Sequence, residues 1–245
     1  MTDRPAVAAF RPADDRIESA VSLLESLGCE PVPDPMLAVE PTGAAPRTDA
    51  DYAVLTSKTG AELAREAGWD PGDTAVCAIG DPTADALREA GYPVSLVPEE
   101  FSSAGLVAAL EDAVTGARVE VARSDHGSAV LTDGLNDAGA YVHETVLYRL
   151  VRPDGAGESA ERAAAGDLDA ALFTSSLTVE YFLDAAAERG VREAAIDGLA
   201  EAVVAVIGEP TRETAEELGI AVDVVPERAD FEALAEAAVT AVRER

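Results

Sequence analysis

The stretch AVLTSKTGAELAREAG at residues 53–68, followed by CAIGDPTADALREAGYPVSLVPEE at residues 77–100, decides the fold. The same pattern returns later in the chain, as ALFTSSLTVEYFLDAAAERG at 171–190 and VAVIGEPTRETAEELGIAVDVVPER at 204–228. Self-similarity over this length indicates a duplicated α/β unit.

The spacing between the two copies locates an insertion. The pair Thr56-Ser57 lies 118 positions before Thr174-Ser175, whereas Gly80 lies 128 positions before Gly208. The second copy therefore carries ten extra residues in its middle.

A weaker repeat relates residues 7–37 to residues 119–151, so part of each domain lies outside the longer repeat. If each domain contains one copy of both repeats, domain 1 is discontinuous and comprises residues 1–38 and 150–245. Domain 2, residues 39–149, is then inserted into it, and two crossing strands join the domains.

Short apolar strands alternate with amphipathic helices along the whole chain, which favours parallel sheets with helices on both faces. The sequence therefore predicts an α/β fold. We expect two flavodoxin-like parallel-sheet domains that face each other across a cleft and are joined by a two-stranded linker.

The charge is strongly negative. Forty-seven acidic residues outnumber 18 basic ones, the formal charge is -29, and Lys58 is the only lysine. Such a surface repels nucleic acid and anionic membranes, so neither is an expected partner. The depletion of lysine and the abundance of acidic residues resemble proteins of halophiles that accumulate salt, where high ionic strength screens the repulsion.

The two cysteines, Cys29 and Cys77, lie in or beside predicted strands, and we interpret them as buried, reduced thiols. No signal peptide and no apolar run long enough to span a membrane is evident, which predicts a cytoplasmic protein.

Small hydroxyl residues follow the predicted strands in both halves. Loops at the carboxyl ends of parallel strands meet helix N-termini, where free N–H groups and the helix dipole favour anions. The candidate substrate-binding residues in these loops are Ser57, Thr83, Ser103, Ser175, Ser176 and Thr211. The alternative is that these side chains only cap their helices.

Motifs for other chemistry are absent. The chain has no phosphate loop with Lys, no GxGxxG after the first strand, no GxSxG and no HExxH. His126 and His143 are not at ligand spacing with Cys or carboxylates, so no metal site is predicted.

Several motifs in order carry a resemblance over essentially the whole chain. They are FRP at Phe10–Pro12, YAVLTS at 52–57, AIGDPTADAL at 78–87, VLYRL at 146–150 and LFTSSLTVEYFL at 172–183. Together they resemble the uroporphyrinogen-III synthase family. The chain departs from the family pattern at Thr59, at Glu209 and at Ser128, which replaces a basic residue.

The resemblance implies cofactor-free cyclisation of hydroxymethylbilane, a linear tetrapyrrole with eight carboxylates, to uroporphyrinogen III. In this reaction water is lost and the last ring, ring D, is inverted. The protein would act chiefly by holding a flexible ligand in the reactive geometry. Tyr148 matches the family's Tyr and is expected to assist departure of the terminal hydroxyl. We expect a monomer, and contact with the enzyme that supplies its substrate is left open.

Other classes remain open at this point. A non-catalytic, cytosolic, two-lobed protein that binds or senses a small anionic ligand would share the predicted fold. An exported solute-binding protein is disfavoured because no export signal is evident. A flavin-binding electron carrier is disfavoured because two aromatic residues that would flank the flavin ring are not evident.

Overall fold

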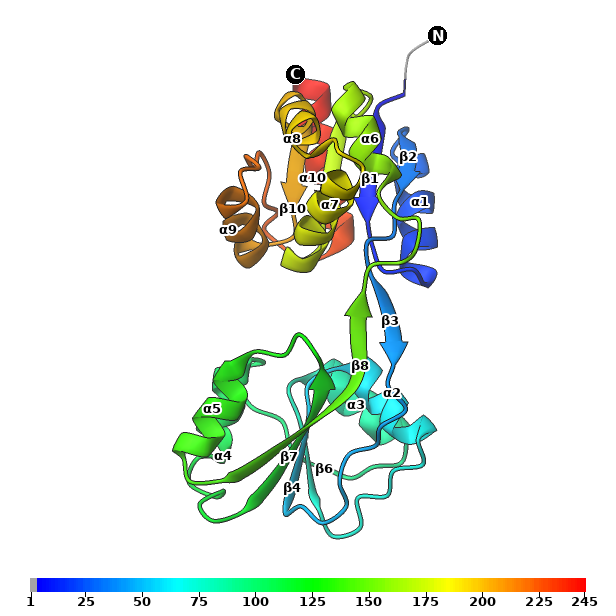
Figure 1. Ribbon diagram of the computed structural model, residues 1–245. Helices are drawn as coiled ribbons and strands as arrows, with labels where there is room; N and C mark the ends of the chain where they lie inside the picture. Colours follow the sequence, from blue (N-terminus) through cyan, green and yellow to red (C-terminus); the bar gives the residue numbers. More distant parts are fainter. Residues whose placement is uncertain (1–3) are drawn as a thin grey trace. The chain divides into compact units, whose positions relative to one another are not determined.

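The structure is a computed structural model that describes residues 4–245. Its contacts divide the chain into two units (Figure 1). Unit 1 comprises the residues up to Ala38 together with Val151–Arg245, and unit 2 comprises Val39–Leu150.

Unit 1 is built on a four-stranded parallel sheet. The strands are β1 (Ala6–Phe10), β2 (Glu30–Pro33), β9 (Ala170–Phe173) and β10 (Val203–Val206), in the order β10-β9-β1-β2. An isolated bridge from Ala205 to Val224 adds a fifth position beside β10. Counted along the chain, the order is 2-1-3-4-5, as in flavodoxin-like folds.

Helices cover both faces of this sheet because β1, β9 and β10 are apolar and buried on both sides. On one face, α1 (Asp15–Ser26) and α10 (Phe231–Glu244) pack against the side chains of Val7 and Ala9. The other face, which includes Ala8 and Phe10, is covered by four helices. These are α6 (Glu158–Ala165), α7 (Ser176–Glu188), α8 (Arg192–Glu201) and α9 (Glu209–Glu217).

Unit 2 contains a six-stranded sheet in the order β3-β8-β7-β4-β5-β6. The strands are β3 (Ala38–Pro41), β4 (Tyr52–Leu55), β5 (Ala75–Ala78), β6 (Val94–Leu96), β7 (Arg118–Ser124) and β8 (Tyr141–Val151). Helices α2 (Lys58–Glu66) and α3 (Asp81–Glu89) pack on one face, and α4 (Ser103–Leu110) and α5 (Ala129–Asp137) on the other. The predicted α/β class with parallel sheets is confirmed.

The two sheets share one strand order with a different chain connectivity. In unit 2, β8-β7-β4-β5-β6 takes the places of β2-β1-β9-β10 and the Val224 bridge in unit 1. The registers agree as well, because Leu55 pairs with Ala78 as Phe173 pairs with Val206. These pairs reproduce the offsets of 118 and 128 residues read from the sequence.

The longer spacer of the second copy contains a helix. Between β9 and β10 unit 1 has both α7 and α8, whereas between β4 and β5 unit 2 has only α2. Helix α8 packs tightly against α6 at Gly198, where an added Cβ would lie 1.8 Å from the Ala163 carbonyl oxygen. The insertion therefore adds a helix that fits only because residue 198 has no side chain.

The chain passes between the two units twice. One unit boundary falls within β3, after Ala38, and the other within β8, after Leu150. These two strands are neighbours in the sheet of unit 2 (Figure 1), and Thr42 N–H donates to the Leu147 carbonyl at 3.0 Å.

A buried carboxylate from another part of unit 1 caps the N-terminus of α6. Asp34, in the loop after β2, is 3% exposed and accepts hydrogen bonds from Gly157 N–H at 2.8 Å and Ser159 N–H at 2.9 Å. The Ser159 hydroxyl also donates to it. Asp34 thus supplies the cap that Gly157, the residue before the helix, cannot provide.

Cys29 and Cys77 are free and buried, as predicted. Burial raises the pKa of both thiols, that of Cys77 to about 12. Among residues 4–245, no helix combines the length and apolar character needed to cross a membrane.

Candidate active site

Ser57 and Tyr148 meet at the carboxyl edge of the sheet of unit 2. Ser57 follows β4 and caps α2, accepting a hydrogen bond from Gly60 N–H at 2.9 Å. Its Oγ also lies 2.9 Å from Oη of Tyr148, which is 7% exposed on β8. The cap and the hydroxyl pair therefore share one oxygen atom.

Helix α3 begins at the same edge without a side-chain cap. Its N-cap is Gly80, with Pro82 in the first turn, and Thr83 in that turn is only 4% exposed. The ring of Phe101, which is 56% exposed, lies so close that a Cβ on Gly80 would be 3.0 Å from it. The uncapped helix start offers backbone N–H donors and the positive end of the helix dipole to an anion.

Ser103 is the first residue of α4 and is half-buried. The cap of this helix is its neighbour Ser102, whose Oγ accepts from Gly105 N–H at 2.9 Å. Ser102 also donates to the Glu100 carboxylate at 2.7 Å. The Ser103 hydroxyl is therefore not used for capping.

In unit 1, Ser175 and Ser176 follow β9. Ser175 forms a capping box with Thr178 at the start of α7. Ser176 Oγ donates to the Pro210 carbonyl at 3.1 Å and accepts from the Thr214 hydroxyl at 2.7 Å. These two bonds join the start of α7 to α9.

Thr211 occupies in unit 1 the position that Thr83 occupies in unit 2. It is 4% exposed in the first turn of α9, whose N-cap Gly208 has no side-chain cap. Gly80 and Gly208 are both extended, with φ of -174° and -178°. Among the sequence-predicted loops of the described residues, unit 1 thus has one hydroxyl-capped and one uncapped helix start, whereas unit 2 has two capped starts, at α2 and α4, and one uncapped start.

Arg11 is a cation at the carboxyl end of β1 that is not among the site residues predicted from the sequence. It directly follows β1, and its guanidinium lies 4.8 Å from the centroid of the Phe231 ring. Its Nε is buried and has no hydrogen-bond partner within the part of the chain that the structure describes. Burial and, to a smaller extent, the charge of Arg16 lower the pKa of this guanidinium. An arginine directly after a strand in a strongly acidic chain is the sequence signal for it.

The segment 123–128 contains Ser128, one of the departures from the family pattern, and Arg123 fixes its conformation. Arg123 is 5% exposed, forms an ion pair with Glu144 at 2.6 Å and donates to the Ser128 carbonyl at 2.6 Å. Gly127 packs on this side chain, because an added Cβ would lie 2.3 Å from Arg123 Cδ. Arg123 therefore orders the loop that follows β7.

The structure brings the predicted residues together in two sets. Within unit 2 they lie at the carboxyl ends of β4, β5 and β6 and near the end of β8; within unit 1 they follow β9 and β10. Hydroxyl groups and uncapped helix starts at these edges are suited to a polar, anionic ligand. The fold and these edges define a ligand-binding α/β protein with a duplicated unit.

The family follows from comparison with known proteins. Residues 18–236 match the family model described as "Uroporphyrinogen-III synthase HemD". A protein of Methanothermobacter thermautotrophicus, provisionally named uroporphyrinogen-III synthase, is 34% identical and is covered over 92% of its length by 91% of this chain. The uroporphyrinogen-III synthase of Synechococcus elongatus is 31% identical over 69% of this chain and 67% of its own.

Solved structures show the same fold. A mutant uroporphyrinogen III synthase of Thermus thermophilus aligns with a TM-score of 0.68 at 21% identity, over 98% of this chain and 100% of that one. The Helicobacter pylori enzyme aligns with a TM-score of 0.63 at 15% identity, over 99% and 100%. The chain belongs to the uroporphyrinogen-III synthase family, whose members are enzymes of tetrapyrrole biosynthesis. The non-catalytic alternative is therefore not favoured.

Proposed function

We propose that the residues at the carboxyl edges of the two sheets bind hydroxymethylbilane and direct its closure to uroporphyrinogen III. The hydroxyl pair of Ser57 and Tyr148 is the observation that carries this proposal, because it places a hydrogen-bonded phenol at the edge of the sheet of unit 2 where α3 starts without a side-chain cap. We further propose that the enzyme acts as a cytoplasmic monomer and needs no cofactor.

The hydrogen bonds of Ser57 allow the serine to be the donor in the pair. Its Oγ accepts from Gly60 N–H, and its own proton can be donated to Tyr148 Oη. In that arrangement the phenolic O–H remains available to the terminal hydroxyl of the substrate. The hydroxyl leaves as water with the phenolic proton, and the electron pair of the adjacent pyrrole replaces the broken C–O bond. Loss of the pyrrole N–H proton then gives a neutral azafulvene, and this proton balances the one that the phenol donated.

Ring closure then depends on geometry. The last ring must attack through its substituted carbon, form a spiro intermediate and invert, whereas unassisted closure gives the other isomer. Orientation of bound groups can supply several kcal/mol of barrier lowering without a strong acid. Thr83 and Thr211, with the open starts of α3 and α9, would bind substrate carboxylates; Ser103, Ser175 and Ser176 are proposed as neighbouring contacts.

Product analysis tests the proposal. Hydroxymethylbilane, generated enzymatically, is added to the purified protein, and the type III and type I products are separated by chromatography after oxidation. We expect predominantly type III product with the protein and type I without it. Type I product alone, in the presence of folded protein, would refute the proposed function.

A further inference from the structure

A cavity lies in unit 2 at the amino-terminal edge of the sheet, away from the hydroxyl residues described above. It has a volume of about 300 Å³ and is lined by polar side chains, namely Arg47, Asp49, Arg118, Glu120, Tyr141 and His143. Arg118 and Tyr141 are the first residues of β7 and β8, which fixes its position in the fold.

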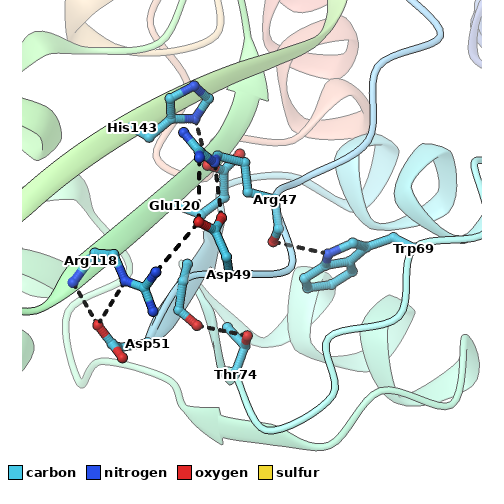
Figure 2. Close-up of polar contacts among 9 residues, drawn as sticks. Arg47, Asp49, Asp51, Trp69, Thr74, Arg118, Glu120 and His143 are labelled. Atoms are coloured by element: carbon cyan, nitrogen blue, oxygen red, sulfur yellow. Dashed lines mark hydrogen bonds and ion pairs between the residues drawn. The ribbon is translucent and has the colours of Figure 1, made fainter.

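The unusual group in this cavity is Glu120. Its side chain is 0% exposed, and it lies on β7 opposite His143 in the ladder with β8. His143 Nδ1 lies 2.7 Å from Glu120 Oε2, but Oε1 has no hydrogen-bond partner among residues 4–245 (Figure 2). A buried carboxylate oxygen without a partner is costly, and ionised carboxylates only accept hydrogen bonds. The cavity therefore has an unused acceptor.

The same cavity has unused donors. Asp49 is shared between two guanidinium groups: it pairs with Arg47 at 3.0 Å and with Arg118 at 3.4 Å (Figure 2). Arg118 also pairs with Asp51 at 3.7 Å. Each guanidinium carries five N–H donors, so these pairs still leave several of them free for a ligand. Half of each arginine side chain is exposed, which keeps these donors accessible.

The charges of the lining decide the kind of ligand. The two arginines face three carboxylates, Asp49, Asp51 and Glu120, so a ligand that carries only negative charge gains little. A molecule with a separated cation and anion matches the unused acceptor and the unused donors at once. We propose that this cavity binds a small zwitterion of the free α-amino acid class, with its ammonium at Glu120 and its carboxylate at Arg47 and Arg118.

Three matched probes test the proposal on the intact chain. L-alanine carries both charges, propionate lacks the ammonium and ethylamine lacks the carboxylate. Titration calorimetry at one salt concentration should show saturable binding of L-alanine and at least tenfold weaker binding of the other two, since one charge-assisted hydrogen bond changes affinity about 10- to 100-fold. Equal binding of propionate or ethylamine, or no binding of L-alanine, would overturn the proposal.

Two variants locate the site. Glu120→Gln keeps an acceptor for His143 but places an N–H₂ group at the other oxygen position, and Arg47→Gln removes an exposed guanidinium. Each should weaken L-alanine binding about 10- to 100-fold, whereas Arg88→Gln, a control at an exposed ion pair of the same unit, should not. Should Glu120→Gln fail to fold, Arg47→Gln and the probe series still decide. Unchanged affinity in a folded Arg47→Gln protein would exclude this cavity as the site.

Discussion

Tyr148 Oη lies 2.9 Å from Ser57 Oγ, and Ser57 at the same time caps helix α2. The serine is therefore fixed by the backbone, and the phenol is fixed by the serine. A group placed in this way can assist a leaving hydroxyl without reorganising during the reaction.

Replacing Tyr148 by Phe should lower kcat about 100-fold, the low end for general acid assistance, because the pyrrole already drives departure of the hydroxyl. The product should remain type III. The control is Tyr92→Phe, which removes a phenol bound to the Trp69 carbonyl elsewhere in the same unit. Type I product from Tyr148→Phe would instead assign the residue to folding of the ligand, and an unchanged rate would remove it from the site.

Thr83→Val and Thr211→Val test the paired helix starts. Both side chains are 4% exposed and valine keeps their shape, so the thermal midpoint should change little. Loss of a hydrogen bond to a substrate carboxylate should raise KM about tenfold or more in each variant. The readout is the initial rate against hydroxymethylbilane concentration, and unchanged KM in both variants would show that these threonines do not contact the substrate.

Asp34→Ala should destabilise unit 1 by about 2 to 4 kcal/mol, because it leaves the N–H groups of Gly157 and Ser159 buried without a partner. Urea unfolding measures this change. Asp154→Ala, at an exposed position in the preceding turn, should cost less than about 0.5 kcal/mol. Equal effects of the two substitutions would contradict the capping role of Asp34.

Salt should strengthen both folding and activity. The formal charge of -29 and a polyanionic substrate repel each other over about 10 Å at 0.1 M salt but over only about 3 Å at 1 M. Stability and kcat/KM measured across this range should therefore rise together. Greatest activity at the lowest salt would refute the halophilic interpretation of the composition.

Cys77 should make stability depend on alkaline pH. Burial raises the pKa of its thiol from 9.0 to about 12, so above pH 9.0 the unfolded chain loses a proton that the folded chain keeps. The contribution of this thiol to stability is complete below pH 9.0 and is lost as the pH rises towards about 12. Cys77→Ala should reduce the slope of unfolding free energy against pH in this window, and an unchanged slope would contradict the assignment.

The repeat made much of the fold predictable. Offsets between the two copies gave the equivalent strands, and the structure places Leu55 and Phe173 at matching registers. The loop residues were predicted from the rule that parallel strands present their carboxyl ends at one edge. For Ser57 and Ser175 the capping alternative also holds, because each accepts a bond from its own helix.

Other features depend on contacts that local patterns do not encode. Asp34 reaches the start of α6 across 123 residues of chain. Glu120 lies between two buried valines of β7, and its unpaired oxygen becomes evident only when β8 brings His143 beside it. The sequence places Arg11 directly after a strand, but its position over the Phe231 ring depends on how distant segments pack in the fold.

The insertion of unit 2 into unit 1 sets an order of events during synthesis. The ribosome has made all residues of unit 2 once Leu150 has been added. Strand β1 of unit 1, in contrast, can pair with its neighbour β9 only after Ala170–Phe173 have been made. Until then β1, whose five residues are all buried in the finished sheet, has only β2 as a partner. Since domains fold as units while the chain grows, the inserted unit matures first, and an apolar strand with an open edge persists at the nascent N-terminal region. That interval is when the growing chain is most exposed to aggregation and most in need of a chaperone.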